Sequence, residues 1–309
     1  MSGALDSVLQ WAAGAIGSGA KVVGTESLRP AGSPWLLRFE HHGEIVEAVL
    51  KAGRDRDELA TEAAALSLAE AHALPTPRLI AADLTGEAAG AMAILFTVLP
   101  GSADIPGRAE PRRLRALGAA AAALHAIPLT PVGDLPLRER HMPWIDFAAM
   151  RRAGATMPGA EEELSTPLLD AADELLQSVP VPSEATVFVH GDLWTGNTMW
   201  DGDAYAGMID WEAAGAGNCG VDLGSLRLDT ALLYGVEFVD DVLIGWQETR
   251  GLVAPDVDYW DVVAALNTRA DMAGFLPTMH AAGRTDLDGP TLTMRRDAFL
   301  RCALDGLGE

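Results

Sequence analysis

Two short polar motifs interrupt the second half of this chain, which otherwise has mainly helical patterns. Residues 190–197 read HGDLWTGN, and residues 209–212 read IDWE. The apolar residues 186–190 predict a buried strand before the first motif, and the sequence between the motifs predicts a hairpin that turns at residues 201–203. A loop after a strand and a hairpin that returns to it would bring polar side chains of both motifs together.

Three oxygen-bearing side chains in these motifs have the types that phosphoryl transfer requires. Asn197 and Asp210 offer the hard oxygen ligands that Mg²⁺ prefers when it also binds phosphates. Asp192 then remains to accept or orient the proton of an attacking hydroxyl group. An isolated Asp in this position would be interpreted as a turn cap, but the complete set at this spacing favours catalysis.

The first third of the chain predicts a small sheet with one helix. Strand patterns cover residues 20–28, 35–40, 44–50, 78–82 and 91–98, and a helical pattern covers residues 57–72. A break at Pro100 and Gly101 precedes mostly helical patterns. We therefore expect an α+β protein with two lobes: residues 1–100 form an N-terminal nucleotide-binding lobe, and residues 101–309 form a larger catalytic and substrate-binding lobe.

A lysine in this first third supplies a candidate cation for phosphate groups. Only two of the 22 basic residues are lysines, Lys21 and Lys51, and Lys51 ends the third predicted strand. Glu62 lies on or beside the apolar stripe of the next helix, between Leu59 and Leu66. An inward carboxylate needs a partner, so Lys51 and Glu62 are expected to pair. The alternative is an exposed lysine and a solvated glutamate.

Composition excludes several classes of partner. A net charge of -22 is unfavourable for a nucleic-acid partner. The longest apolar run, residues 88–100, is shorter than the roughly 20 residues of a membrane helix, and the first residues lack the features of a signal peptide. Two cysteines are too few for a disulfide framework. These features predict a soluble cytoplasmic protein without a membrane partner, and they leave the oligomeric state open.

The motifs HGDLWTGN and IDWE, with Lys51 and Glu62 before them and Asp222 after them, resemble the aminoglycoside phosphotransferase and choline kinase-like family. The resemblance covers about residues 20–235 and implies a bilobal protein-kinase-like fold. It implies that ATP or GTP and Mg²⁺ are the cofactors, and that a small molecule accepts phosphate on a hydroxyl group. Asp192 would be the catalytic base.

The same resemblance assigns roles to further residues. Lys51 would bind the α- and β-phosphates and pair with Glu62, while Asn197 and Asp210 would hold magnesium. Phe96 and Val98 would belong to the hinge that faces the nucleobase, and Asp222 would brace the catalytic loop. The turn at residues 29–34 departs from the glycine-rich loop of protein kinases. Its Gly32 and Ser33 are candidates for phosphate contact, but a plain β-turn explains them equally well.

The acceptor is the least constrained part of the prediction. Candidate contacts are Trp194, Glu212, Asp229 and Asp271, and the acidic composition favours a cationic, antibiotic-like acceptor. A macrolide, sugar, amino alcohol or nucleoside kinase remains an alternative, as does a kinase-shaped protein that binds nucleotide without catalysis. The string GAGNCG at residues 215–220 matches a dinucleotide-binding fingerprint, but it does not begin where the preceding strand ends, as a true fingerprint does, so an NAD-linked oxidoreductase stays a distant alternative.

Overall fold

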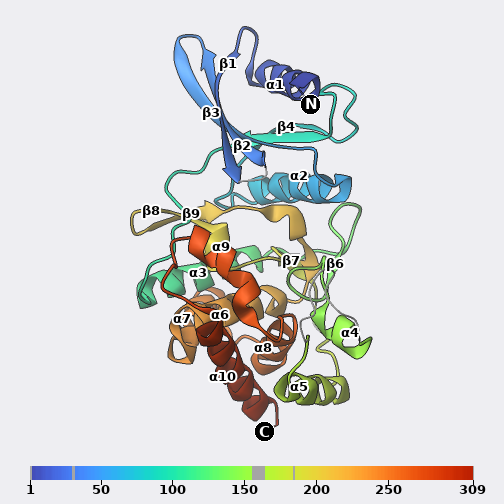
Figure 1. Cartoon of the computed structure of the whole chain (residues 1–309), viewed down its shortest axis with the longest axis vertical. Coiled ribbons are helices and arrows are strands. Elements are labelled where there is room, and N and C mark those ends of the chain that lie inside the picture. The colour runs from blue at the N-terminus through green and yellow to red at the C-terminus, as the bar shows by residue number, and fades with distance from the viewer. Residues whose placement is uncertain (1, 30–31, 155–163, 184, 309) are drawn as a thin grey trace. The chain divides into compact units, whose positions relative to one another are not determined.

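The computed structural model describes residues 2–29, 32–154, 164–183 and 185–308 (Figure 1). Contacts between residues divide the chain into two units. The smaller unit contains the described residues up to 100 together with residues 133–135 and 206–212, and the larger unit contains the rest. Each unit has a buried apolar core of its own.

The smaller unit is an antiparallel sheet with helices. Strands β1 (Lys21–Arg29), β2 (Gly32–His41), β3 (Glu44–Ala52), β4 (Leu79–Asp83) and β5 (Ala93–Thr97) pair in the order β1-β2-β3-β5-β4. Helix α1 (Ser2–Ile16) contacts β1, β2 and β4, and α2 (Arg56–Ala71) contacts β4 and β5. Asp55 caps α2 by accepting a hydrogen bond from the backbone N–H of Asp57 at 2.8 Å.

Alternation along the strands separates the two faces of this sheet. Ala48 and Leu50 of β3 share an apolar cluster with Val8 and Ala12 of α1. Lys51 lies between two of the inward-facing residues of β3, so its side chain projects from the opposite face. Strand pairing places Lys51 beside Ile94. The sheet therefore presents one mainly apolar face and one face that carries a buried cation.

The larger unit is mainly helical. Its helices are α3 (Pro111–Leu124), α4 (Phe147–Arg152), α5 (Pro167–Ser178), α6 (Gly220–Tyr234), α7 (Val239–Arg250), α8 (Val257–Leu266), α9 (Leu276–Ala281) and α10 (Gly289–Leu307). Short 3-10 turns η1 (Thr195–Asn197), η3 (Val236–Phe238) and η4 (Met272–Phe275) connect some of them. Helix α6 is buried from Gly220 to Leu233, because α3, α7, α8 and α10 all contact it. It forms the centre of this unit.

A small sheet in the larger unit leads into the first polar motif. Strand β10 (Gly215–Gly217) pairs in parallel with β6 (Leu137–Arg138) and antiparallel with β7 (Val187–Val189). A Cβ atom on Gly215 would lie 2.3 Å from the carbonyl oxygen of Pro136, so the middle strand has no room for a side chain there. Strands β8 (Thr198–Asp201) and β9 (Ala204–Met208) form the expected hairpin, and η2 (Trp211–Ala213) follows it.

The expected fold class is confirmed, with three differences in detail. The antiparallel sheet and the helical second part are both present. Helix α1 and strand β10 were not expected. The first continuous stretch of the smaller unit ends at residue 100, but residues 206–212 also belong to it. Asp210 and Glu212 are therefore part of the smaller unit, because the chain leaves the larger unit within β9.

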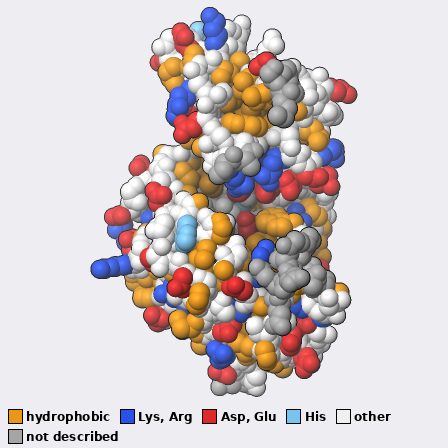
Figure 2. Space-filling model, viewed as in Figure 1, with side chains coloured by type: hydrophobic (Ala, Val, Ile, Leu, Met, Phe, Trp, Pro, Cys, Tyr) orange, Lys and Arg blue, Asp and Glu red, His pale blue; other side chains and the backbone are white. Residues whose placement is uncertain are grey.

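The acidic composition of the chain is visible on its surface. Figure 2 shows Asp and Glu side chains on both units of the face that it draws. Among the described residues, no helix is both long enough and apolar enough to cross a membrane.

Glycine permits the close packing of α3 on α7. A Cβ atom on Gly118 would lie 1.9 Å from the carbonyl oxygen of Val242, and one on Gly245 would lie 2.0 Å from the carbonyl oxygen of Arg115. Both clashes involve backbone, so neither can be relieved by rotating a side chain.

We expect Gly118→Ala to destabilise the larger unit by about 1–3 kcal/mol, because the two helices must separate to admit a methyl group. Urea unfolding followed by circular dichroism measures the change. Gly107→Ala is the matched control, since a Cβ atom at this exposed position in the same unit would meet no atom within 4 Å. Equal stability of the two variants would contradict the close contact.

Candidate active site

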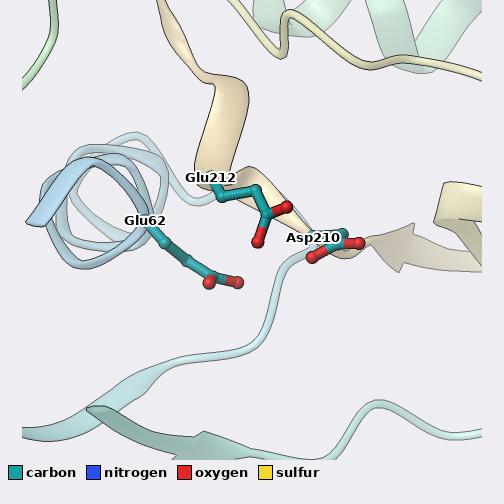
Figure 3. A group of neighbouring side chains, drawn as sticks. All are labelled: Glu62, Asp210 and Glu212. Carbon is teal, nitrogen blue, oxygen red and sulfur yellow. The ribbon is translucent and has the colours of Figure 1, made fainter. Parts of the chain in front are cut away.

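The smaller unit holds a buried lysine among three carboxylates. Lys51 Nζ donates to Glu62 Oε2 at 2.6 Å, to Asp210 Oδ1 at 2.5 Å and to Glu212 Oε2 at 3.5 Å. Lys51 is 4% exposed and Glu62 is 1% exposed. Figure 3 shows the three carboxylates turned toward one another, Glu62 from α2 and the other two from the segment after β9. We call Lys51 and these three acids the lysine cluster.

Two arginines add positive charge to the lysine cluster. Arg29 Nη2 donates to Asp210 Oδ2 at 2.7 Å, and Arg54 Nη2 donates to Glu212 Oε2 at 2.7 Å. Arg54 also pairs with Glu58 at 3.0 Å, so three cations, counting Lys51, face four carboxylates. Direct pairing with cations offsets part of the free-energy cost of burying these charges.

Local electrostatics determine which of these groups carry charge. Burial would raise the pKa of Asp210, but Lys51 and Arg29 outweigh this effect and hold the pKa well below its usual range. Burial would lower the pKa of Lys51, and the neighbouring carboxylates outweigh it and raise the pKa. Burial raises the pKa of Glu62. Asp210 and Lys51 are thus firmly ionised at neutral pH.

Asp210 has an unusual backbone conformation. Its φ is 67°, in the left-handed region that non-glycine residues adopt rarely, although Asp is among the residues that tolerate it. This conformation costs free energy that the contacts with Lys51 and Arg29 offset. Strain of this kind is concentrated at functional sites.

In the larger unit, the loop after β7 fixes Asp192 through Asn197. The side-chain amide of Asn197 donates to the backbone carbonyl of Asp192 at 2.8 Å and to Asp192 Oδ2 at 3.0 Å. The amide nitrogen thus donates both of its hydrogen bonds to Asp192, while Asn197 Oδ1 accepts no hydrogen bond from the described residues. An oriented carboxylate therefore lies beside an amide oxygen that is available to a cation.

Asp222 of α6 holds the start of this loop. Its carboxylate accepts hydrogen bonds from the backbone N–H of His190 at 2.7 Å and of Gly191 at 2.9 Å. Burial would raise the pKa of Asp222, and His125 with the His190 N–H outweighs it and lowers the pKa. Gly191 has a φ of 77°, and a Cβ atom there would lie 2.1 Å from the carbonyl oxygen of Ala213. Only glycine fits this turn.

A chain of two hydrogen bonds, from Trp246 through His125, orients the carboxylate of Asp222. Trp246 Nε1 donates to His125 Nδ1 at 2.9 Å, and His125 Nε2 lies 3.1 Å from Asp222 Oδ2. Because an indole N–H can only donate, Nδ1 must accept and Nε2 must carry the proton that points to Asp222. The chain thus assigns the tautomer of His125.

Asp229, two turns further along α6, holds the middle of the same loop. Its Oδ2 accepts from the backbone N–H of Thr195 at 2.9 Å and from the Thr195 hydroxyl. Burial raises the pKa of Asp229 to about 6, and the bonds from Thr195 oppose this shift. One helix therefore braces the loop at two points, on either side of Asp192.

A hollow of about 240 Å³ in the larger unit opens beside Asp192. It is lined by Asp192, Trp194 and Asp229 from the expected set, and by His141, Met142, Trp144, Ser225, Leu228, Leu232, Phe275, Thr278 and Met279. Apolar side chains predominate. Burial lowers the pKa of His141 to about 4, so this histidine is neutral at physiological pH. We call this space the acceptor hollow.

The remaining predicted residues lie in different places. Phe96 lies two positions beyond Ile94, on the same sheet face as Lys51, and Val98 follows β5. Gly32 begins β2, and Ser33 Oγ accepts from the backbone N–H of Ala52 at 3.2 Å. Residues 30 and 31 of the same expected turn lie outside the described residues.

Two predicted acceptor contacts lie outside the acceptor hollow. Glu212 belongs to the lysine cluster in the smaller unit. Asp271 caps η4 by accepting from the backbone N–H of Ala273 at 2.8 Å, and it lines another hollow of the larger unit. The structure brings Trp194 and Asp229 together with Asp192, but not these two acids.

Sequence reasoning missed four residues of the site. Arg29 and Arg54 were not assigned to the lysine cluster, although Arg54 lies only three residues after Lys51. His125 and Trp246 were not assigned to the loop either. They are 97 and 24 positions away from Asp222 in sequence, so no local pattern connects them.

Comparisons with known proteins give a consistent result. A sequence model described as the phosphotransferase enzyme family matches residues 23–266. No curated protein matches this sequence. Among solved structures, macrolide 2'-phosphotransferase MphH from Brachybacterium faecium is 21% identical, with a TM-score of 0.57 and coverage of 97% of this chain and 98% of that one.

Two further solved structures resemble this chain. A putative aminoglycoside phosphotransferase from Ralstonia eutropha JMP134 is 16% identical, with a TM-score of 0.63 and coverage of 100% of this chain and 98% of the other. A thermostable mutant of aminoglycoside phosphotransferase APH(4)-Ia, in a ternary complex with ADP and hygromycin B, is 16% identical, with a TM-score of 0.54 and coverage of 91% and 94%. At these identities the likeness establishes a shared fold.

The raised pKa of Asp229 predicts how stability depends on pH. Because the folded state keeps its proton up to about pH 6 while the unfolded state loses it near pH 4, this carboxylate reduces stability progressively as pH rises between those values. Asp229→Asn retains an oxygen that can accept from Thr195 and carries no charge. We expect the variant to gain about 2–3 kcal/mol relative to the parent between pH 4 and pH 7.

Urea unfolding at several pH values measures this difference. The exposed Asp203→Asn, which also removes one carboxylate from the larger unit, serves as the control. If the difference in unfolding free energy between Asp229→Asn and the parent did not change from pH 4 to pH 7, the pKa of Asp229 would not be raised.

Proposed function

We infer that this chain, which belongs to the phosphotransferase enzyme family, is a kinase that transfers the γ-phosphate of ATP or GTP to a hydroxyl group of a small molecule. The lysine cluster carries this proposal. Folding does not require a buried lysine among three carboxylates, and such an arrangement costs desolvation free energy. Its presence therefore favours a role in binding an anionic substrate.

In the proposed reaction, Lys51 binds the non-transferred phosphates and Glu62 holds the lysine in position. Asp192 accepts or orients the proton of the acceptor hydroxyl. Because the transition state of phosphoryl transfer is loose, most of the acceleration should come from positioning and charge neutralisation. Asp192 is suited to this task, since Asn197 and the bracing by α6 fix its loop.

Two residues have the oxygen ligands that magnesium prefers. Asp210 in the smaller unit is ionised, and both of its carboxylate oxygens accept from cations, Lys51 and Arg29, so a metal ion would take the place of one of them. Asn197 in the larger unit presents an amide oxygen without a hydrogen bond from the described residues. We propose that each of them contributes a ligand to Mg²⁺, which when bound would neutralise charge on the nucleotide phosphates.

The acceptor hollow favours an acceptor with an apolar surface. Its walls include Leu228, Leu232 and Phe275, and the carboxylate of Asp229 is already bonded to Thr195. Asp192 likewise accepts a hydrogen bond from Asn197, so both acidic residues of the lining are already engaged. This lining supports an amphipathic, macrolide-like hydroxyl compound over a polycationic aminoglycoside. Release of ADP across a panel of macrolides, aminoglycosides, nucleosides and amino alcohols tests this choice, and release with none of them would favour a binding protein without catalysis.

Asp192→Asn should lower kcat by about 10²–10⁴-fold while leaving the KM for ATP nearly unchanged, because the variant loses the proton acceptor but no phosphate contact. Coupled measurement of ADP release provides both constants. The exposed Asp201→Asn in the following hairpin is the control and should retain full turnover. Full activity of Asp192→Asn would refute the assigned role.

The two lysines provide a matched pair for the nucleotide site. Lys51→Met should weaken ATP binding roughly 10- to 100-fold, since a charge-assisted contact contributes about 1.5–3 kcal/mol. It should also lower the unfolding temperature, because three carboxylates lose their shared partner. Lys21→Met at the exposed start of β1 should change neither. Titration with ATP by calorimetry and thermal unfolding distinguish the variants, and unchanged ATP affinity in a folded Lys51→Met protein would disprove the proposal.

A further inference from the structure

Arg29 is a cation beside the lysine cluster to which the proposed reaction gives no role. It ends β1, and its Nη2 donates to Asp210 Oδ2 at 2.7 Å. Lys51 Nζ donates to Oδ1 of the same carboxylate at 2.5 Å. All three residues belong to the smaller unit. Two cations therefore share the carboxylate that the proposed reaction needs as a metal ligand.

The two oxygens of Asp210 differ in their access to solvent. Oδ1 faces Lys51, whose side chain is 4% exposed, and Oδ2 faces Arg29, whose side chain is 49% exposed. A hydrated divalent ion approaches from solvent, so it meets the carboxylate on the side of Arg29. Because a divalent cation and a guanidinium group repel each other at such short distances, they compete for Oδ2.

Lys51 is held in place by a second acid. Its Nζ also donates to Glu62 Oε2 at 2.6 Å, and Glu62 is 1% exposed. If Lys51 left the cluster, this buried carboxylate would lose its counter-ion at a large cost in free energy. Lys51 is therefore expected to stay when a metal ion binds.

Arg29 lacks such a second acid. Among the described residues, its guanidinium group pairs with Asp210 alone. Arg54, by contrast, pairs with Glu212 at 2.7 Å and with Glu58 at 3.0 Å. Ion pairs of half-exposed side chains contribute little to stability, so water can replace the contact of Arg29 with Asp210. Of the three cations, Arg29 is the one that can leave at the lowest cost.

The guanidinium group of Arg29 also suits a phosphate group. Its planar fork of donors matches phosphate oxygens, and such pairs are among the strong charge-assisted hydrogen bonds. Arg29 and Lys51 contact the two oxygens of one carboxylate, so their donors are close enough to bind neighbouring phosphates of one nucleotide. Because the side chain of Arg29 is half-exposed, it has room for this short movement.

We propose that Arg29 occupies the metal side of Asp210 in the free protein and moves to the terminal phosphates of the nucleotide when the metal ion binds. This inference rests on the proposed kinase function and makes Arg29 a nucleotide-binding residue. The exchange keeps the carboxylate of Asp210 paired with a cation in both states, and it releases a guanidinium group where phosphate charge needs one. Metal ion and nucleotide would thus promote each other's binding.

Binding of Mn²⁺, a paramagnetic substitute for Mg²⁺, tests the first part of this exchange without nucleotide. Electron paramagnetic resonance measures free Mn²⁺, and the site of interest is the one that Asp210→Asn abolishes. Arg29→Gln should bind Mn²⁺ there about two- to fivefold more tightly than the parent, because the competing cation is gone. Arg38→Gln removes the same charge from the same sheet, where Arg38 pairs with Glu26 and Glu47, and should bind Mn²⁺ like the parent.

Calorimetric titration with ATP, at saturating Mg²⁺ and without an acceptor, tests the second part. Arg29→Gln should bind ATP roughly tenfold more weakly, since it loses a charge-assisted contact with phosphate. Its affinity for AMP, which lacks the terminal phosphates, should equal that of the parent. Arg29→Lys retains the charge without the planar fork and should recover part of both changes. The two effects have opposite signs, which a general weakening of the fold would not produce.

The outcomes separate this inference from the kinase proposal. Unfolding temperatures near that of the parent show that each variant is folded. Equal Mn²⁺ affinities of the parent and Arg29→Gln, or no Mn²⁺ site that depends on Asp210, would overturn the role of Arg29. Equal ATP affinities of these two proteins would overturn it as well and leave the kinase proposal intact, whereas a parent protein that binds no ATP would refute both.

Discussion

The buried carboxylate of Asp222 is the constraint on which the larger unit depends. It binds two consecutive backbone amides, and it can do so only because Gly191 adopts a conformation that brings both toward α6. A buried carboxylate without these donors would be costly, and the loop without the carboxylate would have unpaired amides. The carboxylate and the two amides therefore offset each other's cost of burial. These hydrogen bonds also fix the position of the loop that carries Asp192.

Charge is handled differently in the lysine cluster and around the loop that carries Asp192. In the smaller unit, cations and carboxylates meet directly around Lys51. In the larger unit, the key carboxylates of α6 are neutralised mainly by hydrogen bonds from neutral donors, and Asp229 keeps its proton up to about pH 6. Direct ion pairs suit a site that must exchange one set of charges for another when a nucleotide binds. Neutral donors suit a scaffold that must stay unchanged.

Much of the fold and part of the candidate site could be predicted from local sequence. The strands alternate clearly, and the scarcity of lysine together with a glutamate on an apolar stripe led to the Lys51–Glu62 contact that the structure contains. Strand β10 could not be predicted, because its glycines and alanine have low strand propensity and are required by neighbouring backbone. The chain from Trp246 through His125 to Asp222 joins residues far apart in sequence. Only tertiary packing reveals such a connection.

In the proposed reaction, the residues that would select the acceptor and the residue that would act on its hydroxyl group lie on different elements. Phe275, Thr278 and Met279 lie on η4 and α9 near the C-terminus, whereas Asp192 lies on a loop anchored to the central helix. Changes in the peripheral helices can therefore alter the shape that an acceptor meets while the reactive carboxylate keeps its supports. A protein built in this way can acquire new acceptors through substitutions at its margin, and laboratory evolution of this scaffold would be directed most productively at those two segments.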